Sequence, residues 1–205
     1  MALDLMSNKG ITATMKTLKK IFLFALITFS ISCSKEDEEF FNAVYTTIPG
    51  LVTIEAQPSF AVNDVLWLNT NTFSRYLTEP NQTTPLDVYR TTNSETFSFL
   101  YRLEKQVNGE WENVAIGTNF IENKGEMSIG NYVTGIAFYN EVTEAYEYRG
   151  GIILTEPGQY RIGFFSGFNG FNFDIISESA NRSTFVTIAT TAFNAPNGFY
   201  NFTVN

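Results

Sequence analysis

The sequence predicts an all-β fold, an antiparallel β-sandwich that follows an export signal helix and a disordered tether. From Phe40 onward, apolar residues recur at every second position over several runs, and such alternation indicates half-buried strands. Threonine, valine, isoleucine, phenylalanine and tyrosine dominate these runs, as suits a pleated sheet. Turn sequences separate the runs, and roughly nine or ten short strands at this spacing favour a sandwich.

The N-terminal segment has the pattern of a secretory signal. Three lysines within 16–20 precede an uncharged apolar run at 21–29, and small residues follow. The apolar run is too short to cross a hydrocarbon core, which needs about 20 residues. We therefore expect residues 1–32 to be a signal peptide, with Met15 as its true start.

Cys33 is the only cysteine in the chain, so it has no partner for an internal disulfide. Ser30, Ile31, Ser32 and Cys33 resemble a lipobox, the sequence at which the thiol is diacylated and the signal peptide is cut. Ser30 departs from that pattern, in which a branched aliphatic residue is usual. The resemblance implies a lipid anchor on Cys33. Each CH₂ group of the acyl chains that is buried in the membrane stabilises membrane binding by about 0.8 kcal/mol. A cysteine placed here by chance is the alternative.

A charged segment follows the cysteine at once and contains no apolar residue, so we expect residues 33–40 to be a solvated tether. Its residues are Ser34, Lys35, Glu36, Asp37, Glu38 and Glu39. The segment resembles the acidic export signal of surface lipoproteins of Bacteroidota. That resemblance implies a location in the cell outer membrane, facing the medium. A plain spacer, with the protein facing the periplasm, is the alternative.

The remaining segment, residues 41–205, is expected to form one β-sandwich domain. Removal of residues 1–32 takes away four lysines and one aspartate, which leaves nine basic and twenty acidic residues and a formal charge of −11. Nucleic-acid binding needs a basic surface, and a peripheral hold on anionic lipid also needs one. We therefore expect neither kind of partner, and we expect contact with the membrane only through the lipid.

The strand and turn signals follow one another along this domain. Asn108-Gly109 predicts a hairpin turn between two runs, and the segment 140–148 is too short and too poorly capped to be read as a helix. Further breaks are expected at Glu156-Pro157-Gly158, Asn169-Gly170 and 196–198. The clearest alternating sets are Val52, Ile54 and Ala56; Phe97, Phe99, Tyr101 and Leu103; Tyr160, Ile162 and Phe164; and Phe171, Phe173 and Ile175.

One local pattern favours a particular sandwich. The segment Leu154–Tyr160, with its Gly-x-Tyr sequence, resembles the corner that enters the penultimate strand of immunoglobulin-like domains. This resemblance implies an immunoglobulin-like sandwich, in which Trp111 is a candidate core aromatic. The segment Phe60–Leu68 resembles a strand found in lipoproteins of the same bacterial group.

Several kinds of chemistry are excluded by composition. The chain has no histidine, which removes Ser-His-acid and Cys-His catalysis and the usual histidine-containing metal sites. No phosphate-binding glycine-rich loop and no calcium-loop spacing is present. We therefore expect no enzyme activity, no metal and no cofactor. A small carboxylate-dependent glycoside hydrolase, which needs only two acidic side chains, is kept as an alternative.

Aromatic residues make up 16% of the chain. Flat aromatic rings bind the C–H faces of sugars, and they also fill cores and protein interfaces. The sequence therefore predicts a non-catalytic binding or accessory module of the cell envelope, for glycan capture or for an uptake complex with a partner protein. A structural or adhesin-like component is the other alternative. The candidate ligand-binding aromatics are Trp67, Trp111, Tyr146 and Tyr148.

Overall fold

The computed structural model describes residues 42–164, 173–178, 184–195 and 197–205, all within a unit that runs from Phe40 to Asn205. The predicted lipidation site Cys33 and the acidic tether lie outside the described residues. More than half of the described residues lie in β-strands and only one short helix is present among them, which confirms the prediction of an all-β fold. Its strands are β1 (Asn42–Thr47), β2 (Thr53–Ile54), β3 (Val65–Asn69), β4 (Tyr76–Leu77), β5 (Leu86–Asp87), β6 (Thr96–Val107), β7 (Glu110–Asn113), β8 (Phe120–Lys124), β9 (Glu126–Ile129), β10 (Val133–Asn140), β11 (Ala145–Glu147), β12 (Arg149–Ile153), β13 (Gly158–Phe164), β14 (Phe173–Glu178), β15 (Thr184–Thr190) and β16 (Phe199–Val204).

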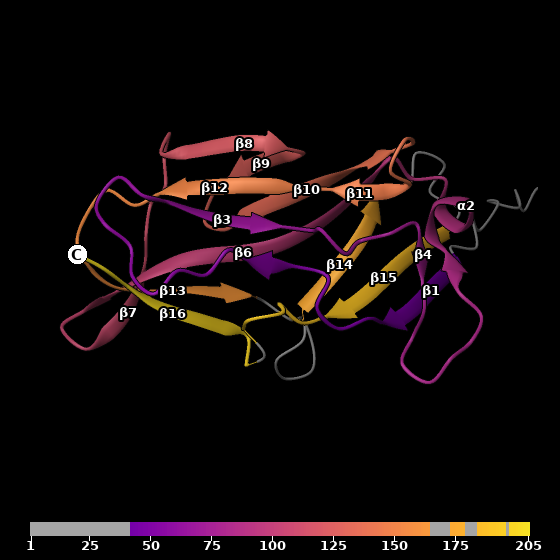
Figure 1. Ribbon diagram of the computed structural model, residues 1–205, viewed down its shortest axis with the longest axis horizontal. Coiled ribbons are helices and arrows are strands. Elements are labelled where there is room, and N and C mark those ends of the chain that lie inside the picture. The colour runs from indigo at the N-terminus through magenta and orange to yellow at the C-terminus, as the bar shows by residue number, and fades with distance from the viewer. Residues whose placement is uncertain (1–41, 165–172, 179–183, 196) are drawn as a thin grey trace, which may run out of the picture. The chain divides into compact units, whose positions relative to one another are not determined.

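The strands form one large sheet, one smaller sheet and one short ribbon (Figure 1). The large sheet has the order β1-β15-β14-β6-β10-β11, with β13 and β7 also paired to β6, β16 paired to β13, and β9 paired to β10. The smaller sheet has the order β2-β3-β12-β8, and β4 pairs with β5. Buried apolar residues of the large and the smaller sheet belong to one hydrophobic core.

The long central strand β6 shows how the sequence builds this core. Phe97, Phe99, Tyr101 and Leu103 are between 0% and 3% exposed, whereas Leu100 on the opposite face is 42% exposed. Because successive side chains of a strand point to opposite faces, the alternating sequence places one apolar row in the core. The prediction from this alternation is confirmed.

The predicted hairpin at Asn108-Gly109 is also confirmed. Both residues have positive φ angles, 52° and 91°, as a type I′ turn requires, and β7 pairs antiparallel with β6 on its far side. The segment 140–148 contains the end of β10, a turn and β11, so the expectation that it is not a helix is confirmed.

The corner before β13 has the expected local geometry. The hydroxyl of Tyr160 donates to the carbonyl oxygen of Glu156 at 2.9 Å. Gly158 between them has φ 151°, a conformation that side chains disfavour. The strand expected over Phe60–Leu68 is shorter than predicted: it occupies only Val65–Asn69. It starts late because Asp64 closes a turn, in which its carboxylate accepts from the N–H of Ala61.

The prediction of purely antiparallel pairing is wrong, most clearly at the edge that β1 forms. Strand β1 pairs with β15 in parallel, with Tyr45 opposite Thr187. Alternation along a strand tells which face a side chain takes, but it carries no information on the direction of the neighbouring strand. The two strands lie near opposite ends of the domain sequence. Parallel neighbours cannot be joined by a tight turn and need a connection of about a dozen residues or more, which this separation provides.

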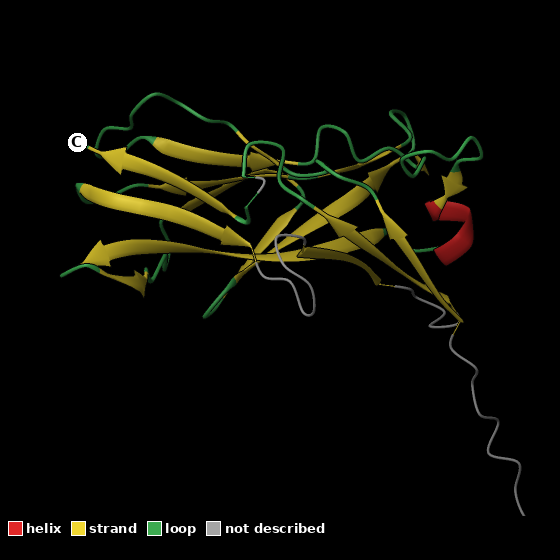
Figure 2. Ribbon diagram, turned by 90° about the horizontal axis from the view of Figure 1, so that it is seen from below, coloured by secondary structure: helices red, strands yellow, loops and turns green. Residues whose placement is uncertain are grey.

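One helix is present among the described residues and was not predicted, α2 (Val88–Thr92). Asp87 caps its start by accepting from the N–H of Arg90, and Asn93 ends it with φ 50°. Five residues are too few to show a helical repeat, so only the two caps mark it in the sequence. Figure 2 shows α2 at one end of the domain. No helix in the described parts of the chain has both the length and the apolar character to cross a membrane.

Candidate functional site

Two of the four predicted ligand-binding aromatics are buried. Tyr146 is 0% exposed and Tyr148 is 1% exposed. The Tyr146 hydroxyl donates to the carbonyl oxygen of Ser94 at 2.9 Å, and the Tyr148 hydroxyl lies 2.7 Å from that of Tyr101. Burial raises the pKa of Tyr148. The prediction that these two rings bind a ligand is wrong, because the core already uses both their rings and their hydroxyls.

Trp67 lies on the outer face of the smaller sheet and is partly buried. The guanidinium carbon of Arg149 lies 3.9 Å from the centre of its ring. Glu55 accepts two hydrogen bonds from the same guanidinium, at 2.8 and 2.9 Å, and these bonds hold the cation in place. This ring face is therefore occupied by a side chain of the protein itself.

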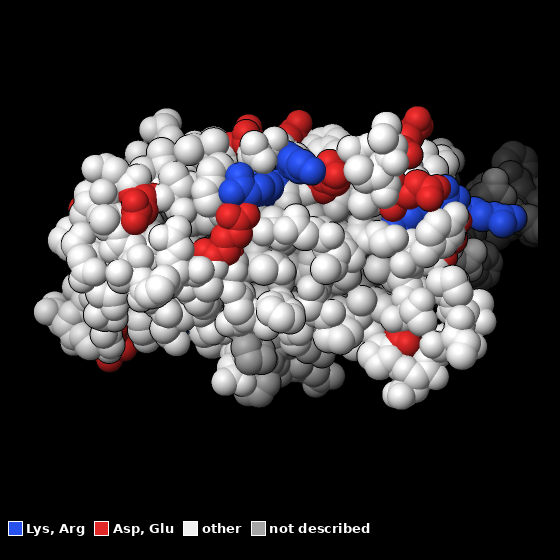
Figure 3. Space-filling view, in the orientation of Figure 1, with Lys and Arg blue, Asp and Glu red and all other residues white. Residues whose placement is uncertain are grey.

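Trp111 is held in a similar way on the outer face of the large sheet. The guanidinium carbon of Arg161 lies 4.4 Å from the Trp111 ring centre and 4.2 Å from that of Phe199, and its Nε donates to Glu104 at 2.6 Å. Trp111 is half-buried, so the expectation of a core aromatic is wrong. Figure 3 shows charged groups gathered in mixed clusters, with wide uncharged areas between them.

A different site lies on the outer face of β1, β15 and β14, which run side by side in Figure 1. The strand register sets two rows of side chains across this face. Thr47, Ala189 and Asp174 form one row, and the next row is Tyr45, Thr187 and Ile176.

A hollow of about 280 Å³ opens among these rows, near the lower end of the range for ligand pockets. Ala189 occupies the middle of the first row and is too small to fill the space between its neighbours. The described residues that line the hollow are Tyr45, Thr46, Thr47, Glu79, Asp174, Thr187 and Ala189.

Glu79 reaches the hollow from the segment between β4 and β5. One of its carboxylate oxygens accepts from the hydroxyl of Thr46 at 2.6 Å and from the N–H of Thr47 at 3.2 Å. The other accepts from the amide of Gln82 at 2.6 Å. The bonds from Thr46 and Thr47 hold the pKa of Glu79 below its ordinary value, so this carboxylate stays ionised.

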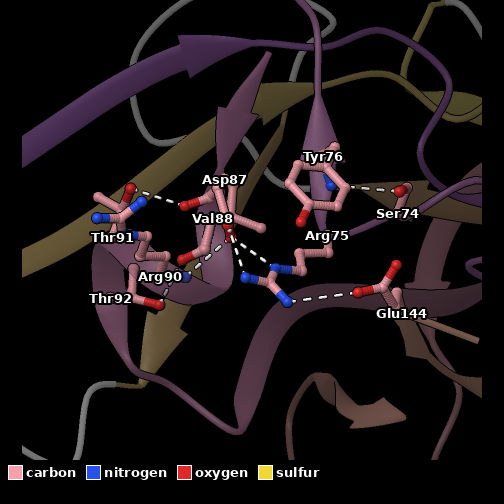
Figure 4. A network of polar contacts seen from close by, with 9 residues as sticks. All are labelled: Ser74, Arg75, Tyr76, Asp87, Val88, Arg90, Thr91, Thr92 and Glu144. Carbon is pink, nitrogen blue, oxygen red and sulfur yellow. Dashed lines mark hydrogen bonds and ion pairs between the residues drawn. The ribbon is translucent and has the colours of Figure 1, made fainter. Parts of the chain in front are cut away.

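The base of that segment is clamped by an ion-pair network (Figure 4). Arg75 donates to both carboxylate oxygens of Asp87, at 2.8 and 2.7 Å, and its other terminal nitrogen lies 3.4 Å from Glu144. Asp87 also caps α2 through the N–H of Arg90 at 2.9 Å. The clamp joins β4, β5 and α2, and it thereby holds the segment that carries Glu79.

Three groups of the hollow have no partner among the described residues. Tyr45 is 76% exposed, and its ring stacks on no other described ring. The carboxylate of Asp174 and the hydroxyl of Thr187 make no side-chain hydrogen bond within the described parts of the chain. An open aromatic ring beside an open carboxylate and an open hydroxyl is a surface able to bind a polar ligand.

A second depression, of about 450 Å³, lies along β10 and the turn after it. It is shallow, and its polar groups bind one another. Glu147 lies 3.1 Å from the ammonium of Lys124 and accepts from Asn140 and Thr143. The polar groups named here are therefore already bound within the domain, and the exposed lining residues Phe138 and Val142 are apolar. Within the described residues, no group of three acidic or other metal-binding side chains comes together.

Comparison with known proteins gives no match. No family model matches the chain, no curated protein matches it, and no solved structure matches it. The chemistry of the site therefore rests on its own residues.

The sequence did not single out Tyr45, Asp174 or Thr187. Asp174 and Thr187 each stand between more hydrophobic neighbours in their strands, and Tyr45 is one of ten tyrosines in the chain. Their one common signal is that they point to the solvent face of their strands. That signal alone does not say which strands are neighbours.

Proposed function

We propose that this chain is a lipid-anchored, non-catalytic binding module of the cell envelope, and that the hollow beside Tyr45 binds part of a glycan. The observation that carries the proposal is that the exposed Tyr45 ring and Asp174, one row and two strands apart, line the same hollow and have no partners in the described chain. A sugar ring needs both features, an aromatic face for its C–H groups and polar side chains for its hydroxyls.

The polar groups of the hollow fit the edge of a sugar. A carboxylate accepts hydrogen bonds only, and a hydroxyl both donates and accepts. Asp174 and Thr187 therefore match the paired donors and acceptors of neighbouring sugar hydroxyls. The volume suits one or two sugar units, so a longer glycan would extend over the open face beyond it.

Binding is favoured over hydrolysis by the state of Glu79. Glycoside hydrolysis needs one carboxyl group that can donate a proton, with a raised pKa. The hydrogen bonds from Thr46 and Thr47 act on the pKa of Glu79 in the opposite direction. Asp174 would remain the one open carboxyl group among the described lining residues, and one is too few for that mechanism.

We further propose that the domain is an immunoglobulin-like sandwich carried on Cys33 at the surface of a Bacteroidota outer membrane. The tyrosine corner at Tyr160 and the two sheets around one core support the sandwich. The lipobox-like sequence and the acidic tether support the anchor and its location.

Glycan binding is tested with the full mature protein in detergent, first on a glycan array and then by titration calorimetry with the bound glycans. Tyr45→Ala is expected to weaken binding about tenfold or more, as for an aromatic anchor. Phe193→Ala is the matched control, because Phe193 is also 76% exposed and lies outside the hollow. Absence of glycan binding, or equal losses in both variants, would contradict the proposal.

The anchor is tested in cells. Cys33→Ser is expected to release the protein in soluble form, and protease treatment of intact cells is expected to digest the wild-type domain. Retention of the variant in the membrane fraction would refute the lipid anchor. Survival of the domain under protease would refute the surface location.

A protein partner is a second candidate, favoured by apolar side chains on the same outer face. Leu100 and Ile176 are 42% and 44% exposed, and both flank Ser98 across the pairing of β6 with β14. Exposed apolar area on a sheet face is typical of interaction sites. Leu100→Asp is expected to abolish binding of such a partner while glycan binding persists, which cross-linking in cells would measure.

A further inference from the structure

We infer that the hollow beside Tyr45 selects uncharged or cationic glycans and rejects glycans that carry carboxylate or sulfate groups. The inference rests on the proposed glycan-binding function and names the ligand class for that same site. It is carried by the two acidic side chains of the hollow, Glu79 and Asp174. The described residues around them supply only uncharged hydrogen-bond donors to Glu79 and no ion pair to Asp174.

No cation of the described chain compensates the charges of these two side chains. The hydrogen-bond donors to Glu79 are all uncharged: a hydroxyl, a backbone N–H and a side-chain amide. Asp174 forms no ion pair with any residue of the described chain. Among the described lining residues there is no lysine and no arginine. The hollow therefore presents two formal negative charges to a ligand.

Acidic residues elsewhere on the domain surface are often held differently. Many of those near aromatic rings lie within ion-pair distance of a lysine or an arginine, which cancels their charge locally. The residues paired in this way are Glu55, Asp87, Glu104, Glu144, Glu147 and Glu156. The hollow thus combines an open aromatic ring with acidic groups that no cation of the described residues neutralises.

The expected discrimination follows from Coulomb's law. A ligand carboxylate about 6 Å from one fixed carboxylate is disfavoured about threefold in a water-like dielectric, and two such carboxylates give about tenfold. Salt screens this repulsion, because the Debye length falls from about 30 Å at 0.01 M to about 8 Å at 0.15 M. Discrimination by charge should therefore shrink as salt is added, whereas discrimination by shape should not.

The test uses the full mature protein in detergent and two matched sets of glucose trimers, one β-1,4-linked and one α-1,4-linked. Each set contains the neutral trimer, its C6-carboxylate form and its 2-amino form. We expect the neutral and amino trimers of a set to bind at least about tenfold more tightly than the carboxylate trimer at 0.01 M salt, and this ratio to fall at 0.15 M.

Two variants locate the effect. Asp174→Asn is expected to reduce the neutral-to-carboxylate ratio about threefold. Glu112→Gln removes the same charge from the exposed hairpin strand β7, outside the hollow, and should leave the ratio unchanged. Equal changes in both variants would show that net charge alone repels acidic glycans and would overturn the inference.

The remaining outcomes separate the two proposals. Carboxylate trimers that bind as tightly as neutral ones overturn charge selection and leave the proposed glycan site standing. Failure of every trimer and of the glycan array to bind overturns the glycan site and charge selection together.

Discussion

Glu104 offers the sharpest test of how the outer face of the large sheet is held. Its side chain is 3% exposed and lies 2.6 Å from nitrogens of both Arg102 and Arg161, whose side chains are 28% and 19% exposed. The guanidinium of Arg161 is in turn placed between the rings of Trp111 and Phe199. Glu104→Gln removes the negative charge from this cluster and leaves two partly buried cations beside a neutral amide.

The expected cost is about 2–3 kcal/mol of unfolding free energy. Removing one partner of a fully buried pair costs about 3–5 kcal/mol. The cost expected here lies at or just below the lower end of that range, because both arginines retain some contact with water. For a domain of this size, that loss lowers the melting temperature by about 4–12 °C.

Urea unfolding at pH 7 measures the free energy, and tryptophan emission gives a local readout because Trp111 contacts Arg161. Glu112→Gln, on the exposed side of the same hairpin, is the matched control and should change stability by less than about 0.5 kcal/mol. A loss below about 0.5 kcal/mol for Glu104→Gln would refute the view that this carboxylate holds the cluster together.

Three further predictions concern the backbone, the helix cap and pH. Gly125→Ala should cost well over 1 kcal/mol, because Gly125 has φ +68° and an added Cβ would lie 2.3 Å from a backbone carbonyl oxygen. Gly117→Ala, with φ +57° and no atom within 4 Å, should cost only about 1 kcal/mol, so equal losses by urea unfolding would contradict the steric argument. Asp87→Ala should cost more than about 1 kcal/mol, because it removes both the α2 cap and the ion pair with Arg75. Asp87→Asn removes the ion pair but keeps a side-chain oxygen for the cap, so it should melt at a higher temperature than Asp87→Ala. The reverse order would argue against capping. Hydrogen bonding from Arg149 holds the pKa of Glu55 below its ordinary value. The ionised Glu55 therefore stabilises the fold above about pH 4, and this contribution is lost as pH falls further. Urea midpoints that do not decrease between pH 5 and pH 3 would contradict this.

The sequence predicted the local elements of the fold well. The alternating row on β6 and the Asn108-Gly109 turn depend on residues that are close in the chain, and both are present as expected. The Gly-x-Tyr corner at Tyr160 also acts within five residues. The period of the side chains and the φ angles that a turn needs are local properties, so the sequence states them directly.

The candidate site could not be predicted in the same way. Trp67 and Trp111 were reasonable candidates, but each has a guanidinium against its ring. In both cases the arginine comes from a strand tens of residues away. Tyr146 and Tyr148 come from a short strand region whose burial depends on the sheet packed above it. Aromatic content thus indicated a binding surface without indicating which rings are open.

The sequence by itself determined an all-β domain, the face that most side chains take, and the absence of histidine-dependent chemistry. It also determined a lone cysteine in a signal-like context, from which the lipid anchor is proposed. Only the tertiary structure decided that β1 lies parallel to β15 and that Tyr45, Thr187 and Asp174 share one face. The physical reason is that alternation fixes the orientation of a side chain relative to its own strand. Neighbouring strands are chosen by packing and hydrogen bonding between segments far apart in the chain.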